Sequence, residues 1–216
     1  IAQQRYQDWL RTWCRPLKPR PQWFREVWNF RTHWTHTQKN NDPQYNWYLI
    51  GEDRYQAEEF IARDKELFGK VDMNHFFDWR ISKEHGTWGD YSHFEDIGGL
   101  DRFRAVIRQQ QEAGIRVGLY MDAFLCSKKS EIGLAHGEDW AIKDEAGRYR
   151  SAYSQPDDAM WNMCIFSKGW PEYLSERCAW VSETTGCDGI YLDEGGMGVA
   201  YYWCWRDDHG HPVPAN

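Results

Sequence analysis

The residues of this sequence with the clearest chemical potential are carboxylates that end short apolar runs. Asp193 and Glu194 follow the run 189–192 in "CDGIYLDEGG", Asp122 follows "IRVGLYM", and Asp78 follows "KVDMNHFF". Asp and Glu are poor strand formers, so a strand that stops in a solvated turn is one interpretation. A site that needs carboxylates is the other, because two carboxyl groups held in different protonation states can divide acid and base work between them.

The elements that must position these carboxylates alternate between strand and helix. Apolar and β-branched runs predict strands, and apolar stripes at helical spacing predict helices. The predicted strands span residues 26–35, 70–80, 115–126 and 187–196, and the predicted helices span residues 53–68, 99–114 and 169–186. Gly114 and Gly186 end two of the helices, and Pro171 lies near the start of the last. This alternation predicts a parallel sheet with helices outside it.

In such a sheet, Asp78, Asp122 and Asp193 would meet at one edge. Each of them ends its strand just before a loop. The carboxyl ends of parallel strands form the ligand-binding edge of open α/β sheets and of eight-stranded barrels. Three carboxylates in register at this edge favour an active site over three unrelated turns.

Two segments resemble a known group of enzymes. The segment "GDYSHFEDIGGLDRFRAVIRQQQEAGIRVGLYMDA" (89–123) and the segment "DGIYLDE" (188–194) are similar to the glycoside hydrolase clan of α-galactosidases and their relatives, or to an uncharacterised branch of that superfamily. "VWNFRTHW" is a weaker match to the first strand of the clan, and the resemblance covers roughly residues 26–196. The fold class that it implies is α/β, a (β/α)8 TIM-type barrel of which this chain holds about the first four βα units.

The resemblance implies that Asp193 is the nucleophile of a retaining glycosidase. Such an enzyme also needs a second carboxylic acid that protonates the leaving oxygen. In the clan that acid ends the sixth strand, which would lie beyond Asn216, the last residue here. Asp78 and Asp122 would hold substrate hydroxyls. In an alternative β-glycosidase-type barrel, Glu194 is the acid/base, although adjacent strand residues such as Asp193 and Glu194 point to opposite faces.

The expected domain organisation follows from the same pattern. Residues 1–25 would form a segment that precedes the barrel, and residues 26–216 the N-terminal half of the barrel. An inserted loop or hairpin is expected at about 127–168, with "WAIKDEAGRYRSAY" (140–153) as its hairpin. A complete barrel needs about 250 residues, and the chain begins "IAQQRYQDWL". We therefore expect a piece of a longer gene product, completed by the missing half of the barrel.

Further candidate residues flank the predicted site. Trp79, Arg80 and Trp28 are candidates for substrate binding beside the carboxylates, although each Trp is equally compatible with a core position. His209 and His211 form a His-x-His pair in the loop after the fourth strand, where we expect a solvated or substrate-facing loop. Six cysteines are spread singly without a C-x-x-C pair. We therefore predict no metal site, and no cofactor, because phosphate-binding and dinucleotide motifs are absent from the sequence.

The amino-acid composition limits the classes of molecule that the chain is expected to bind. A net charge of −7 with interspersed acids and bases argues against nucleic acid. No apolar run of eighteen residues is present, which argues against a membrane partner. Aromatic residues make up 17% of the chain, which suits a large core and also suits sugar ligands. A carbohydrate substrate is the expected partner; association into a homo-oligomer and the cellular compartment are left open.

The predicted function is hydrolysis of O-glycosidic bonds in an oligosaccharide or glycoconjugate. The alternative from another class is a non-catalytic carbohydrate-binding or assembly protein, in which the same aromatic and acidic residues bind sugar without cleaving it. Release of a reducing end separates the two, because a binding protein leaves the glycan intact.

Overall fold

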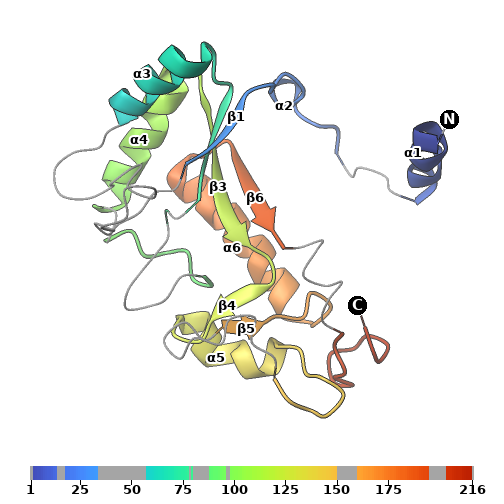
Figure 1. Cartoon of the computed structure of the whole chain (residues 1–216). Helices are drawn as coiled ribbons and strands as arrows, with labels where there is room; N and C mark the ends of the chain where they lie inside the picture. Colours follow the sequence, from blue (N-terminus) through green and yellow to red (C-terminus); the bar gives the residue numbers. More distant parts are fainter. Residues whose placement is uncertain are drawn as a thin grey trace.

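A four-stranded parallel sheet forms the centre of the computed structural model, which describes residues 2–13, 18–33, 57–77, 79, 88–95, 98–149, 160–194 and 203–215. Its strands are β1 (Phe30–His33), β2 (Met73–Phe76), β3 (Arg116–Asp122) and β6 (Gly189–Asp193), in the order β1-β2-β3-β6. All three neighbouring pairs are parallel. The predicted parallel α/β sheet in sequence order is therefore confirmed (Figure 1).

Three helices connect these strands as the sequence predicts: α3 (Ala57–Phe68), α4 (Leu100–Glu112) and α6 (Trp170–Thr185). The apolar stripe of α4 is buried through Phe103, Val106 and Ile107. Proline stands in the first turn of α6, and Gly186 ends that helix with a left-handed φ of 75°, a conformation that glycine adopts without steric penalty.

The two faces of the sheet differ in chemistry because successive strand residues point to opposite sides. On the face that packs against α4 and α6, the strands contribute Phe76, Val117, Leu119 and Met121 to the main hydrophobic core. Figure 1 shows both helices on one side of the strands. The opposite face is aromatic and polar, and it carries the carboxylates described below.

The segment after β3 is more structured than the predicted hairpin. It contains β4 (Leu125–Ser127), α5 (Glu131–Trp140) and β5 (Met160–Asn162), and β4 pairs antiparallel with β5. The predicted strand 115–126 is interrupted, because the Asp122 side chain accepts backbone N–H bonds from Phe124 and Leu125 and bends the chain. Residues 150–153 of the predicted hairpin 140–153 lie outside the described residues, and residues 143–149 form a turn closed by an isolated bridge between Lys143 and Tyr149.

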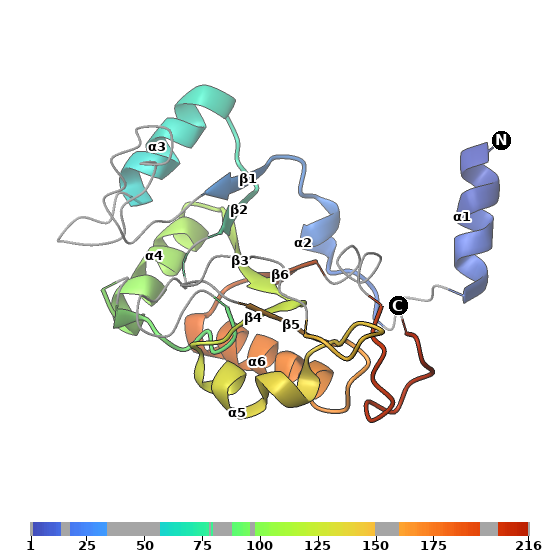
Figure 2. The same ribbon diagram turned by 60° about the horizontal axis from the view of Figure 1, so that its bottom comes forward.

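The two ends of the chain complete the architecture. Residues 2–13 form α1 (Ala2–Trp13) and residues 22–25 form α2 (Gln22–Arg25), neither of which the sequence analysis predicted. The segment 203–215 has no helix or strand, and its two ends meet in an isolated bridge between Cys204 and Ala215. It lies beside the carboxyl end of α5, where Arg206 and His209 contact the carbonyl groups of Glu138 and Asp139 (Figures 1 and 2). In the described part of the chain, no helix has the length and apolarity needed to cross a membrane.

Candidate active site at the carboxyl ends of the parallel strands

Asp122 and Asp193 occupy matching positions at the carboxyl ends of neighbouring strands. They are register partners in the β3–β6 pair, so their side chains project from the same face. The hydroxyl of Tyr120 lies between them, 3.1 Å from Oδ2 of Asp122 and 2.9 Å from Oδ2 of Asp193. The two carboxylates are therefore linked through one phenol.

The environment of Asp122 favours its protonated form. The side chain has no exposed surface, and burial raises the pKa of its carboxyl to about 7. Hydrogen bonds from the N–H groups of Leu125 and Phe124 to Oδ1 (2.7 and 2.8 Å) oppose this shift, whereas the negative charge of Glu194 adds to it. Desolvation is the larger effect because ionising a buried carboxyl removes its charge from water.

The Tyr120 hydroxyl cannot donate to both carboxyl groups at once. The Tyr120 hydroxyl has one hydrogen to donate, yet it contacts two carboxyl groups. When Asp122 is protonated, it can donate to the Tyr120 oxygen, which leaves the Tyr120 hydrogen for Asp193. Burial, which raises the pKa of Asp122, favours this arrangement, whereas a hydrogen bond donated by Tyr120 to the ionised carboxylate lowers that pKa.

Asp193 accepts a hydrogen bond from a second phenol, that of Tyr191. The hydroxyl of Tyr191 donates to its Oδ1 over 3.2 Å, and the negative charge of Asp193 raises the pKa of Tyr191. The Asp193 side chain is half-buried. Two phenol donors on an accessible carboxylate hold it in a fixed orientation while leaving it open to a ligand, as a nucleophilic carboxylate requires.

An aromatic cluster lies on the same face as the carboxylates. The His75 ring is 4.9 Å from the Tyr191 ring and 6.0 Å from the Tyr120 ring, measured between centroids. Phe30 stacks on His75 at 5.7 Å, and Phe77 contacts Tyr120 at 4.3 Å. These rings restrict the rotamers of the two tyrosines that hold Asp193.

Glu194 lies next to the pair and outside the strand. It follows the last residue of β6 and has a left-handed φ of 57°, so strand alternation does not place it on the opposite face from Asp193. Burial raises the pKa of Glu194, and the charge of Asp193 adds to that shift. Glu194 also contributes to the raised pKa of Asp122. The three carboxyl groups are therefore close enough for their charges to interact.

Three of the predicted substrate contacts need correction. Trp79 is fully buried; its ring stacks on Phe103 at 5.5 Å and its Nε1 donates to the Tyr120 carbonyl, so it is a core residue. Trp28 is 91% exposed but precedes β1, at the amino end of the sheet and away from the carboxylates. Asp122 itself has no surface for a sugar hydroxyl, and its oxygens hold the turn and Tyr120.

The other predicted residues fall in two places. Asp78 and Arg80 lie outside the described residues. His209 and His211 lie in the segment 203–215, where they meet Cys164 and Cys204.

Tyr120 and Tyr191 are not among the site residues predicted from the sequence, although a signal for both is present there. The segments "GLYMD" (118–122) and "GIYLD" (189–193) share the pattern G-x-Y-x-D. Residues two apart on a strand point to the same face, so this pattern places each tyrosine beside its aspartate.

Comparison with known families places the chain in one of them. The family described as "Domain of unknown function (DUF6259)" matches residues 1–215. The chain belongs to the DUF6259 family. No curated protein matches the DUF6259 chain.

Solved structures share the fold of this DUF6259 chain. An α-amylase from Lactobacillus plantarum is 17% identical with a TM-score of 0.55, over 79% of this chain and 39% of its own. An α-N-acetylgalactosaminidase from Bifidobacterium bifidum is 16% identical with a TM-score of 0.55, over 76% and 28%. An α-galactosidase from Thermus thermophilus, in complex with stachyose, is 19% identical with a TM-score of 0.51, over 85% and 34%.

These structures are glycoside hydrolases, so the DUF6259 chain has a glycoside hydrolase-like α/β fold. It spans between 28% and 39% of the length of the three structures. The match therefore concerns part of each enzyme.

Proposed function

We propose that this chain is the N-terminal half of a (β/α)8-barrel glycoside hydrolase that hydrolyses O-glycosidic bonds in an oligosaccharide or glycoconjugate. The observation that carries the proposal is the pair Asp122 and Asp193, joined by Tyr120 at the carboxyl edge of the parallel sheet. That edge is where barrel enzymes keep their catalytic groups. The fold shared with glycoside hydrolases supports it.

Asp193 is the proposed nucleophile of a retaining reaction. Its ionised carboxylate attacks the anomeric carbon and forms an ester bond to the sugar while the bond from that carbon to the leaving oxygen breaks. A second carboxylic acid gives its proton to the leaving oxygen, and water later hydrolyses the ester. Tyr120 and Tyr191 keep Asp193 oriented for attack, and the acid is supplied by the part of the barrel that follows this chain.

A second candidate makes Glu194 the acid/base of a β-glycosidase-type barrel. Its raised pKa favours this assignment, because an acid must keep its proton near neutral pH. The orientation of Asp193 between two phenols favours Asp193 as the nucleophile.

Two experiments on the native gene product test the proposal. The variant Asp193→Asn should lose measurable hydrolysis of aryl glycosides and natural oligosaccharides while keeping the wild-type circular dichroism spectrum. Asp101→Asn is the matched control, since the Asp101 side chain is exposed on α4 and far along the chain from the site, and it should keep full activity. Activity retained by Asp193→Asn would remove the nucleophile assignment.

A fluorinated mechanism-based glycoside identifies the group that reacts. Mass spectrometry of the trapped protein should find the glycosyl ester on the peptide that carries Asp193. An ester on a carboxylate other than Asp193 and Glu194 would instead support the candidate in which Glu194 is the acid/base. Glycan binding by the native protein without any release of reducing ends would favour the non-catalytic carbohydrate-binding alternative.

A further inference from the structure

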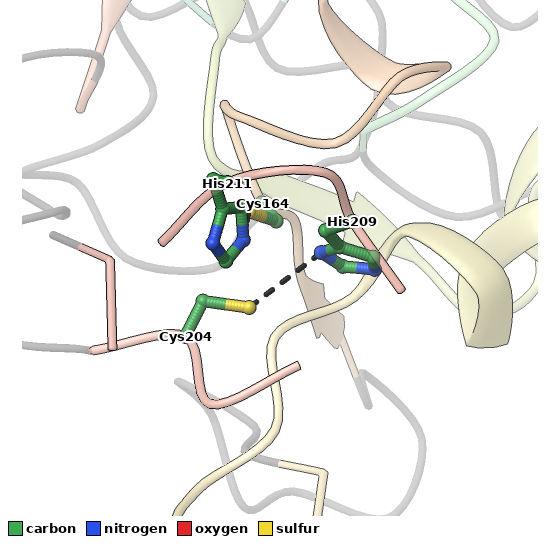
Figure 3. Close-up of side chains that lie close together, drawn as sticks. All are labelled: Cys164, Cys204, His209 and His211. Atoms are coloured by element: carbon green, nitrogen blue, oxygen red, sulfur yellow. Dashed lines mark hydrogen bonds between the residues drawn. The ribbon is translucent and has the colours of Figure 1, made fainter. Parts of the chain in front are cut away.

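Four side chains with metal-binding atoms meet outside the carboxylate site. Cys164 follows β5, and Cys204, His209 and His211 lie in the segment 203–215. One potential ligand atom from each residue lies within 4.8 Å of all the others. Figure 3 shows both rings and both sulfur atoms turned toward a common space. Two thiols and two imidazoles are one of the ligand sets that structural zinc sites use.

Two of the separations between ligand atoms match those around a tetrahedral ion. Nε2 of His211 is 3.4 Å from Sγ of Cys164, and Nδ1 of His209 is 3.5 Å from Sγ of Cys204. Zinc bound to sulfur at about 2.3 Å and to nitrogen at about 2.0–2.1 Å, with tetrahedral angles, requires nitrogen and sulfur to be about 3.5 Å apart. The side chains therefore need little movement to coordinate an ion.

Both histidines also have their second ring nitrogen fixed by a carbonyl group. Nε2 of His209 is 2.8 Å from the carbonyl oxygen of Asp139, and Nδ1 of His211 is 2.8 Å from that of Pro212. A carbonyl only accepts, so each of these nitrogens carries the proton. In the neutral ring the other nitrogen then directs its lone pair at the cysteines, which is the second-shell arrangement of metal-ligating histidines.

Three of the four side chains are buried, and His211 is half-buried. Cys164, Cys204 and His209 are buried, at 2%, 1% and 4% exposure. The adjoining small pocket is lined mainly by apolar residues, Phe124 and Ile142 among them. Two thiolates balance the charge of a divalent ion, so a bound zinc would add no net charge to this buried place.

We propose that Cys164, Cys204, His209 and His211 bind one structural zinc ion. Four protein ligands leave no open coordination position, which is the mark of a structural rather than a catalytic zinc. Soft sulfur together with imidazole in tetrahedral geometry selects zinc over magnesium or calcium. This inference does not depend on the proposed hydrolase activity.

The ion would fasten the segment 203–215 to the edge that holds the carboxylates. Cys164 stands beside Met163, whose N–H donates to the Phe124 carbonyl over 2.7 Å. Phe124 in turn donates its N–H to Asp122. The zinc therefore ties a segment without helix or strand to the turn that Asp122 closes.

The test measures metal in the native gene product, purified without chelators or metal-affinity resin. Elemental analysis should find one zinc ion per chain, and replacement by cobalt chloride should give the visible absorption of tetrahedral cobalt with sulfur ligands. His211→Gln should lose the zinc on dialysis, whereas His211→Cys, which restores a ligand, should keep it. Cys178→Ala is the matched control, because Cys178 is a half-buried thiol on α6 outside the cluster, and it should retain one zinc ion.

Three outcomes would overturn the proposal. The first is wild-type protein that binds no zinc even after incubation with zinc chloride. The second is a Cys164–Cys204 disulfide, detected as a chain lighter by two hydrogens whose two thiols resist alkylation. The third is retention of one zinc ion by His211→Gln after dialysis, with a wild-type circular dichroism spectrum, which would show that the metal binds elsewhere.

Discussion

Replacing Asp122 by Asn should make the protein less sensitive to rising pH. The Asp122 carboxyl has a pKa of about 7 in the folded protein, against an ordinary value of 3.8, because it is buried. Between these two values the unfolded chain has lost this proton and the folded chain keeps it. Stability therefore falls as pH rises from about 4 to 7, since the unfolded state binds fewer protons there.

The magnitude follows from the size of the shift. Each pKa unit corresponds to about 1.4 kcal/mol, so the full penalty above pH 7 is about 4 kcal/mol, of which less than half is already present at pH 5. Asn mimics the protonated form: its oxygen can accept the N–H groups of Phe124 and Leu125, and its amide can donate to Tyr120. The free energy of unfolding of Asp122→Asn, relative to wild type, should therefore rise by about 3 kcal/mol between pH 5 and pH 8.

Urea denaturation followed by tryptophan fluorescence, at pH steps from 5 to 8, measures this difference. Asp101→Asn serves as the control, because Asp101 is fully exposed and its variant should follow wild type at every pH. A difference between Asp122→Asn and wild type that stays constant from pH 5 to pH 8 would refute the reasoning. It would mean that Asp122 is ionised in the folded protein and that Tyr120 donates to it.

Two further predictions concern the residues that surround the pair. Tyr120→Phe removes the hydroxyl that orients Asp193. Because a hydrogen bond to a charged group contributes about 1.5–3 kcal/mol, kcat in a glycoside assay should fall roughly tenfold to hundredfold with KM little changed. An unchanged kcat would contradict the role of Tyr120. Trp79→Ala should lower the free energy of unfolding by about 3–5 kcal/mol, because Trp79 is fully buried against Phe103. A loss below about 1 kcal/mol in urea denaturation would show that Trp79 is not a core residue.

Local sequence patterns were sufficient for the order and type of the main elements. The stripe of apolar residues over 99–114 and the glycine after each helix predicted α4 and α6, because helical periodicity and C-caps are properties of neighbouring residues. The alternation of strand and helix then predicted the parallel sheet, and with it the common edge of Asp122 and Asp193. α5 was missed because two glycines lower its helix propensity; both are buried in the structure, where packing decides.

Other features were decided only by tertiary structure. Whether Trp79 contacts a ligand or the core depends on what packs on its ring. The Phe103 ring packs on it, and Phe103 is remote from Trp79 in sequence. The raised pKa of Asp122 follows from its burial and from the negative charge of Glu194, which no local pattern encodes. Cys164 is forty residues before Cys204, so their meeting with His209 depends on how β5 and the segment 203–215 fold against one another. The sequence by itself determined which residues end the strands, because strand ends depend on neighbouring residues. The tertiary structure decided which side chains meet, because burial and charge act between residues far apart in the chain.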